Sequence, residues 1–177
     1  MRAAKKKVTD EREADFRAWV IQNRTHLRTT AFLLCGDWFL ADDLVQDALG
    51  RLFSRWDRVA ASGDPRPYVN RILCNLHTDY QRRPARREIS ERDVSAARPH
   101  PHTTIDERDD DLIAALHAIP ARQRAVLVLR FFEDYSVEQT AALIKTSTGN
   151  VESQTSRGLE ALRSALKLNP SSAKGVS

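Results

Sequence analysis

Arginines and tyrosines are the residues of this sequence whose types and spacing suit a definite chemistry, the recognition of nucleic acid. Residues 66–87 contain six arginines and a single acidic residue, Asp79, together with Tyr68 and Tyr80. Guanidinium groups bind phosphates in a bidentate manner, and exposed rings or amides can engage unstacked bases. The stretch therefore indicates a nucleic-acid surface, with a solubilising basic helix end as the alternative.

An acidic segment lies earlier in the chain. Residues 37–50 contain four aspartates and no lysine or arginine. If this segment is helical, its polar residues form a face opposite the apolar one; they are Asp42, Asp43, Gln46 and Asp47. The functional interpretation is a docking surface for a basic partner, and the alternative is an ordinary solvated face.

Residues 136–167 read as two helices separated by the short break TSTG. Ser136 has Gln139 three residues after it, which is the spacing of a capping box. A short turn with a glycine, followed by a helix with a polar outer face, is typical of a helix-turn-helix, although an ordinary αα-hairpin has the same pattern. The second helix carries Glu152 and Gln154 where cations would bind phosphates. A carboxylate can instead accept from a cytosine amino group, and an amide can pair with adenine.

Other kinds of chemistry find no support in the residue pattern. The sequence has no Ser/His/Asp set, no Gly-rich phosphate loop and no metal-ligand spacing, so we expect no enzyme activity, no metal and no cofactor. Cys35 and Cys74 are far apart and fit reduced cytosolic thiols. No apolar run approaches the roughly 18 residues that span a bilayer, so we expect a cytoplasmic protein without membrane insertion.

Helices are the elements that must position these residues. Apolar residues at helical steps predict one helix up to Leu34 and a second up to Trp56, joined near Gly36. A third begins near Tyr68, after the breaker cluster ASGDPRP. Later in the chain, Pro120 suits the first position of another helix. No segment requires a β-strand.

Residues 84–107 interrupt the helical periodicity. The stretch contains three prolines, four arginines and almost no large apolar residues, so it cannot bury enough surface to offset chain entropy. The predicted fold is all-α, with two small helical domains joined by a flexible linker, the second domain containing the helix-turn-helix. The predicted boundaries are a basic N-terminal tail (1–10), a first domain (11–83), the linker (84–107), a second domain (108–168) and a C-terminal tail (169–177).

Three segments, in this order, resemble the extracytoplasmic-function sigma factors, the smallest group of the bacterial sigma-70 family, in a form similar to the sigma-E-like branch of actinobacteria. They read ADDLVQDALGRLF, YVNRILCNLHTDYQRRPAR and LHAIPARQRAVLVLRFFEDYSVEQTAALIKTSTGNVESQTSRGLEALR. The resemblance implies an RNA polymerase sigma factor that binds core polymerase and directs promoter-specific transcription initiation by recognising −10 and −35 elements. The first domain would be sigma region 2 and the second region 4. The alternative is a stand-alone helix-turn-helix regulator, which would not need the acidic helix.

The resemblance also implies roles for individual residues. Those at the positions that bind the β′ clamp helices of the polymerase are Asp43, Gln46 and Asp47. Those at the positions for −10 recognition, with Asn75 at the pocket for a flipped base, are Arg71, Asn75, Asp79, Arg82 and Arg83. Those at the positions for −35 recognition are Asn150, Glu152, Ser153, Gln154, Ser156 and Arg157. The implied partners are core polymerase, through its β′ clamp helices and β flap, promoter DNA, and an anti-sigma factor.

Overall fold

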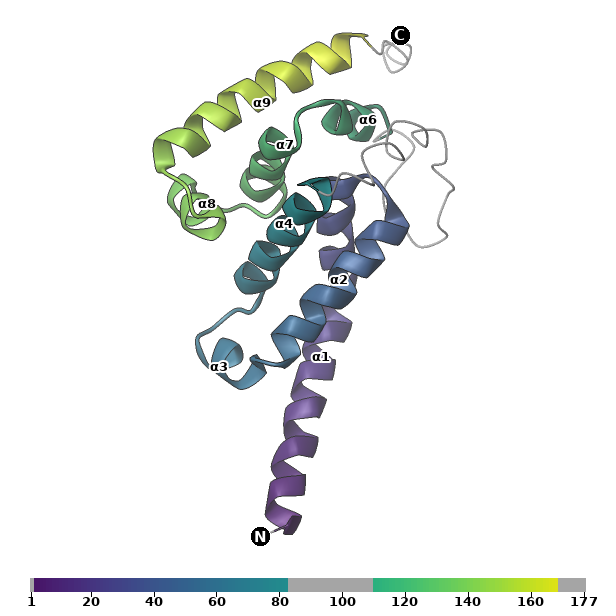
Figure 1. The fold of residues 1–177 in the computed structure, drawn as a ribbon, viewed down its shortest axis with the longest axis vertical. Coiled ribbons are helices and arrows are strands. Elements are labelled where there is room, and N and C mark those ends of the chain that lie inside the picture. Colours follow the sequence, from purple (N-terminus) through teal and green to yellow (C-terminus); the bar gives the residue numbers. More distant parts are fainter. Residues whose placement is uncertain (1, 83–109, 169–177) are drawn as a thin grey trace, which may run out of the picture.

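The computed structural model describes residues 2–82 and 110–168, and all regular structure within these two ranges is helical (Figure 1). The first range holds α1 (Arg2–Cys35), α2 (Trp38–Phe53), α3 (Trp56–Ala61) and α4 (Arg66–Arg82). The second holds α6 (Asp110–Ala118), α7 (Ala121–Leu127), the π-helical η2 (Val128–Phe132), α8 (Val137–Ile144) and α9 (Thr148–Leu168). The prediction of an all-α fold is confirmed. Arg83, the linker 84–107 and the tail 169–177 lie outside the described residues.

The predicted junction between the first two helices is confirmed. Gly36 has a φ of 79°, in the left-handed region that favours glycine, and so allows α2 to fold back along α1. The Asp37 side chain then caps α2 by accepting hydrogen bonds from the backbone N–H groups of Phe39 (2.7 Å) and Leu40 (3.0 Å). Residues 2–10, expected to be a basic tail, are the first turns of α1, which extend away from the other helices (Figure 1).

The end of the second helix differs from the prediction, because α2 stops at Phe53 and Trp56 begins the short helix α3. This break lets the Trp56 side chain enter the core. The centroid of its ring lies 5.3 Å from the ring centroid of Phe16 and 5.9 Å from that of Trp19. The free energy gained by burying a large aromatic side chain is greater than the free energy lost by ending the helix at Phe53. Helix α4 begins at Arg66, within the breaker cluster and two residues earlier than expected, so Pro67 lies in its first turn.

The second domain contains the predicted capping box. Ser136 Oγ accepts from the backbone N–H of Gln139 at 3.1 Å, and Gln139 Oε1 accepts from the backbone N–H of Ser136 at 2.8 Å, so α8 begins as the sequence indicates. Pro120 lies immediately before α7 rather than at its first position. The segment η2, between α7 and α8, is a π-helix, in which the backbone N–H of Glu133 donates to the carbonyl of Val128 at 3.0 Å.

The turn of the helix-turn-helix is shifted from the position that its glycine suggests. Lys145, not Gly149, has the left-handed conformation, with a φ of 55°. Ser147 Oγ accepts from the backbone N–H of Asn150 at 3.2 Å, so α9 starts at Thr148 and Gly149 lies in its first turn. A capping serine therefore sets the start of the helix.

The two domains pack against each other. Helix α4 lies beside α8, and α1 contacts α6, α7 and η2 (Figure 1). One cluster of buried apolar residues extends through both domains and includes Phe32, Leu34, Leu116, Ile119, Leu127 and Leu129. Most of the buried apolar residues in the described ranges therefore belong to one core, and a smaller cluster of Val126, Ala141 and Val151 lies within the second domain.

Candidate functional site

The acidic face of α2 is present as predicted. Asp43, Gln46 and Asp47 are exposed, while the opposite side of the helix is buried against α1 and α4. Within the described part of the chain, neither Asp43 nor Asp47 forms an ion pair. Asp42 differs from them, because Arg28 of α1 donates to both of its carboxylate oxygens, at 2.6 and 3.1 Å. The exposed stripe Asp43–Gln46–Asp47 is thus available to a partner, and Asp42 is used within the domain.

An apolar groove continues this face toward the end of α2. Its volume is about 340 Å³, and it is lined by Glu13, Phe16, Arg17, Val20, Ile21 and Phe53. Phe53 lies two helical turns beyond Gln46 on the same side of α2. Ile21 is 73% exposed, which is unusual for a large aliphatic side chain beside a core. The helical pattern of the sequence predicted the two helices that carry Phe16 and Phe53 but did not reveal this groove.

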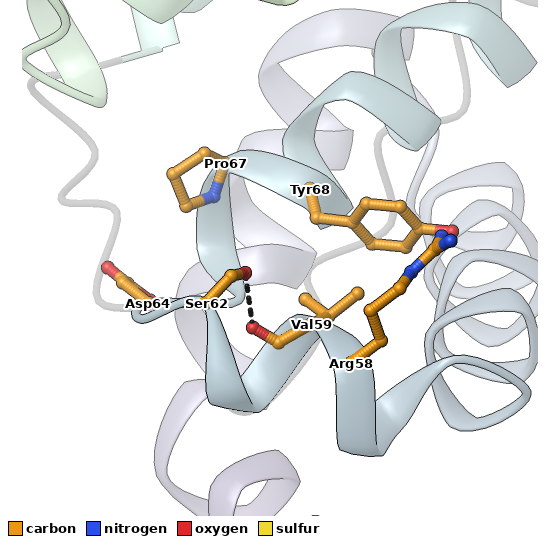
Figure 2. A pocket seen from close by; sticks show the side chains of 6 residues that line it. All are labelled: Arg58, Val59, Ser62, Asp64, Pro67 and Tyr68. Carbon is orange, nitrogen blue, oxygen red and sulfur yellow. Dashed lines mark hydrogen bonds between the residues drawn. The ribbon is translucent and has the colours of Figure 1, made fainter.

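A second pocket lies at the breaker loop, between α3 and the start of α4 (Figure 2). Its volume is about 460 Å³, and it is lined by Arg58, Val59, Ser62, Asp64, Pro67 and Tyr68. The Tyr68 ring and the Arg58 side chain lie along one wall, with the guanidinium near the phenol end of the ring (Figure 2). The pocket therefore combines an aromatic face, a cation and small polar groups.

The loop beneath this pocket is held by local polar contacts. Ser62 Oγ donates to the carbonyl of Val59 at 2.7 Å, and the Asp64 carboxylate accepts from the side chain of Arg66 at 2.7 Å and from its backbone N–H at 3.0 Å. Partial burial raises the pKa of Asp64, but the hydrogen bonds from Arg66 outweigh it and leave the pKa below its ordinary value. Asp64 is therefore a carboxylate that can only accept hydrogen bonds at neutral pH.

The residues predicted for the −10 element share one face of α4. Asn75, Asp79 and Arg82 are exposed, and Arg71 is half-buried beside them. Asn75 does not line the pocket at the breaker loop, but Tyr68 does and lies two turns earlier on the same face. Reasoning from the sequence missed Arg58, because only the path of the chain through the breaker loop brings α3 and Tyr68 to one pocket.

The residues predicted for the −35 element divide into two groups on α9. Glu152, Ser156 and Arg157 are exposed, and Ser153 is partly so. The two amides instead make contacts within the motif: Asn150 Nδ2 donates to Thr146 Oγ1 at 2.7 Å, and Gln154 Nε2 lies 3.5 Å from Asn150 Oδ1. Asn150 thus ties α9 to the turn, and Gln154 is held only by a long contact.

The residues that the structure describes contain neither a metal-binding group nor a reactive thiol. No group of three or more His, Cys, Asp or Glu side chains in those ranges could hold a metal ion. Burial raises the pKa of the Cys35 and Cys74 thiols to about 12, so both stay protonated and unreactive at neutral pH. Among the described helices, none is long and apolar enough to cross a membrane.

Comparison with known proteins places both domains in one family. Residues 19–87 match the family described as Sigma-70 region 2, and residues 109–162 match Sigma-70, region 4. The chain is 32% identical to the RNA polymerase sigma-E factor of Streptomyces antibioticus over 136 residues, which cover 77% of this chain and 76% of the relative. It is 30% identical to the sigma-E factor of Streptomyces avermitilis over 159 residues, covering 86% of each.

A solved structure gives the same assignment. The sigma factor RpoE of Bartonella quintana, in a co-crystal with the anti-sigma factor NepR, superposes with a TM-score of 0.68 at 26% identity and covers 86% of this chain and 97% of its own. A regulator with a helix-turn-helix alone would not account for the match to region 2. The chain belongs to the extracytoplasmic-function sigma factors of the sigma-70 family, the subunits that give RNA polymerase its promoter specificity.

Proposed function

We propose that this sigma factor docks on RNA polymerase through the exposed face of α2, captures a −10 base at the breaker-loop pocket and reads the −35 element with α9. The observation that carries the proposal is the exposed stripe Asp43–Gln46–Asp47, which has no cation to pair with in the described structure and lies beside an apolar groove. A basic helical partner with one apolar side chain would complement both features. This partner is the β′ clamp-helix pair of the polymerase.

The breaker-loop pocket suits a base that has left the stack. Tyr68 offers a ring for stacking, Arg58 a cation, and Ser62 and Asp64 polar groups that can meet the edge of a base. We assign Arg71, Arg82 and Arg83 to the strand backbone and Asn75 and Asp79 to neighbouring bases of the −10 element. The replacement Tyr68→Ala should reduce promoter melting, measured by permanganate footprinting, while affinity for core polymerase is retained.

On α9, the exposed residues Glu152, Ser153, Ser156 and Arg157 are proposed to enter the major groove. Gln154 can join them because its contact with Asn150 is long, at 3.5 Å. Asn150 acts differently in this proposal: it fixes the orientation of α9 through its hydrogen bond to Thr146. Specificity at −35 then comes from a short set of side chains, and most affinity comes from the polymerase and the −10 contacts.

Three further properties follow from the family. Sigma factors are regulatory, non-enzymatic proteins, and we propose that this chain has no catalytic activity of its own. The co-crystallised relative from Bartonella quintana is bound to an anti-sigma factor, and such a regulator is a candidate partner here. RNA polymerase works in the bacterial cytoplasm, so the chain is proposed to act there.

Runoff transcription with core polymerase on a promoter library tests the function. The wild-type chain should direct initiation from a defined set of promoters. The double replacement Asp43→Lys and Asp47→Lys should weaken core binding at least about tenfold, because it places cations against a basic partner. Glu160→Lys, a charge reversal at an exposed glutamate of α9, is the control. Unchanged core affinity in the double variant would remove the docking assignment, and absence of any core-dependent transcript would remove the function itself.

A further inference from the structure

A row of three polar side chains connects the turn of the helix-turn-helix to α9. Asn150 Nδ2 donates to Thr146 Oγ1 at 2.7 Å, and Gln154 Nε2 lies 3.5 Å from Asn150 Oδ1. Residues four apart on a helix lie on the same side of it, so Asn150 and Gln154 are neighbours on α9. The three residues are partly buried, and they are called the polar row below.

The backbone fixes the first member of the polar row. Lys145 has the left-handed conformation, with a φ of 55°, and the backbone N–H of Thr146 donates to the carbonyl of Ala141 at 2.9 Å. This is the hydrogen bond of a Schellman motif, which ends α8. Because Ala141 is buried, the position of the Thr146 side chain depends on the packed part of the domain.

The orientation of the Asn150 amide sets that of the Gln154 amide. Asn150 Nδ2 faces Thr146, so Asn150 Oδ1 faces along α9 toward Gln154. If the Gln154 amide alone were reversed, its Oε1 would face Asn150 Oδ1, and both of these oxygens are acceptors. A separation of 3.5 Å is too long to hold Gln154 firmly, but it makes one orientation of the amide more favourable than the other.

The remaining polar groups of Gln154 match the edge of one base. The contact with Asn150 uses one N–H group of Nε2, and Oε1 has no hydrogen-bond partner among the described residues. Gln154 therefore offers one donor and one acceptor. In the major groove, adenine presents the complementary pair, an acceptor at N7 and a donor at N6, whereas guanine presents two acceptors, N7 and O6. If both amides of the row were reversed, Gln154 would present two N–H groups, which suit guanine.

We propose that the polar row makes Gln154 specific for adenine in the −35 element, with Thr146 and Asn150 as positioning residues. The inference rests on the proposed function, in which α9 enters the major groove. Neither positioning residue has to touch a base, because each acts through the next side chain of the row. A side chain that is already oriented loses less conformational entropy on binding than a free one does.

Selection of −35 sequences from a randomised library by holoenzyme tests the proposal. The wild type should prefer adenine over guanine at one base pair by at least about fivefold, the lower end of the range for a bidentate contact. Gln154→Ala should lose this preference at the same base pair. Thr146→Val and Asn150→Ala keep Gln154 but interrupt the row, so both should bring adenine and guanine close to equal preference. Asn150→Asp should keep the preference, because a carboxylate still accepts from Gln154 Nε2 and from the Thr146 hydroxyl.

Thr155→Val is the matched control for Thr146→Val. It makes the same change on α9 at a hydroxyl that donates to the carbonyl of Val151, 2.8 Å away within the same helix. This variant should select the same sequences as the wild type. A second probe is promoter DNA in which 7-deazaadenine, which lacks the N7 acceptor, replaces the selected adenine. The substituted DNA should bind the wild-type holoenzyme more weakly and should leave the affinity of Gln154→Ala unchanged.

The outcomes separate this inference from a structural role and from the proposed function. If the polar row only stabilised the turn, Thr146→Val would weaken binding to all −35 sequences equally and leave the adenine preference intact, which would overturn the proposal. Selection of guanine by the wild type at this base pair would overturn it as well. If the wild-type holoenzyme showed no −35 preference at any base pair, the proposed role of α9 would fail instead.

Discussion

His77 and His117 lie near the buried guanidinium of Arg124 and are uncharged at neutral pH. Burial and the charge of Arg124 lower the pKa of each to about 4. No hydrogen-bond partner for either ring nitrogen of His77 occurs within the described residues. Protonation of these rings would place a second cation beside Arg124, so the packing around it depends on their neutral form.

The first prediction concerns pH. In the unfolded chain both histidines titrate near pH 6.5, so between pH 6.5 and about 4 the unfolded state binds more protons than the folded state. Stability should therefore be complete above pH 6.5 and fall as the pH is lowered toward 4. His26 has the opposite sign, because its hydrogen bond to Glu133 raises its pKa and its contribution is lost at higher pH.

Thermal unfolding followed by circular dichroism from pH 7.5 to 4.5 checks this prediction. His77→Leu should flatten the acidic decline of the melting temperature, because the replacement cannot take up a proton. His26→Gln is the comparison, since His26 does not contribute to the acidic decline. Equal slopes in the wild type and His77→Leu would show that other groups cause the decline.

The second prediction concerns how α9 reads DNA. If Glu152 and Gln154 contact bases, the double replacement Glu152→Lys and Gln154→Arg should change the −35 sequences that holoenzyme selects from a randomised library. If they only lie near phosphates, the variant should bind all sequences more tightly and with a steeper salt dependence, by roughly one unit of slope for each added phosphate contact. We expect changed sequences. Identical selected sequences from both proteins would exclude base reading.

Individual site residues could be predicted from the sequence where one helix alone determines their position. The face shared by Asp43, Gln46 and Asp47 follows from helical periodicity, and their exposure is confirmed. The pairing of Asp42 with Arg28 could not be predicted, because it joins two helices across a packed interface. The same reason explains why Arg58 was missed at the pocket.

At the scale of the elements, two glycines within helices provide the third prediction. Gly50 of α2 has open space where a Cβ would lie, so Gly50→Ala should stabilise the fold by about 1 kcal/mol and raise the melting temperature by roughly 2–4 °C. Gly158 of α9 is the matched case, because a Cβ there would lie 3.1 Å from Leu127 Cγ. Leu127 is buried and has little room to move, so Gly158→Ala should lower the melting temperature.

Differential scanning calorimetry of the two variants measures both effects. The comparison isolates packing, since each substitution makes the same chemical change inside a helix. A rise in melting temperature for Gly158→Ala would mean that α9 does not approach α7 as closely as the structure has it.

Most helices could be predicted from the sequence because their signals are local. The capping box at Ser136 and the junction at Gly36 depend on residues within one turn and are confirmed. The π-helical turn η2 has no comparable signal: it inserts one residue per turn, which rotates the following residues about the helix axis and so directs Glu133 toward α1. The left-handed Lys145 was likewise missed, because glycine is the usual residue there.

At the scale of the molecule, the presence of two helical units could be predicted, but their contact could not. Two amphipathic units separated by a proline-rich stretch are visible in the sequence alone. The contact between the two units depends on buried residues such as Leu34 of α1 and Leu129 of η2, which each unit could equally have packed within itself. A pattern of apolar positions identifies what is buried and does not identify the partner.

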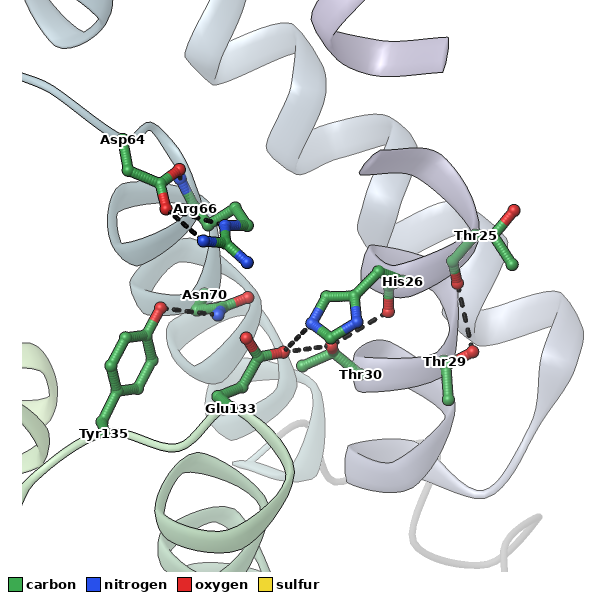
Figure 3. A network of polar contacts seen from close by, with 9 residues as sticks. All are labelled: Thr25, His26, Thr29, Thr30, Asp64, Arg66, Asn70, Glu133 and Tyr135. Carbon is green, nitrogen blue, oxygen red and sulfur yellow. Dashed lines mark hydrogen bonds and ion pairs between the residues drawn. The ribbon is translucent and has the colours of Figure 1, made fainter. Parts of the chain in front are cut away.

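The contact between α4 and α8 has a kinetic consequence. If polymerase binds only molecules in which α4 and α8 have separated, the observed association rate should rise with polymerase concentration and then reach a plateau equal to the rate of separation. Glu133 contacts His26 of α1 at 3.0 Å (Figure 3), so Glu133→Gln should weaken the attachment of one domain to the other. Stopped-flow fluorescence should find this plateau for the wild type and a higher one for Glu133→Gln, whereas a strictly linear dependence would mean that the polymerase binds before the two helices separate. The packing of two helices would then set how quickly a cell can assemble new holoenzyme, however much of the factor it makes.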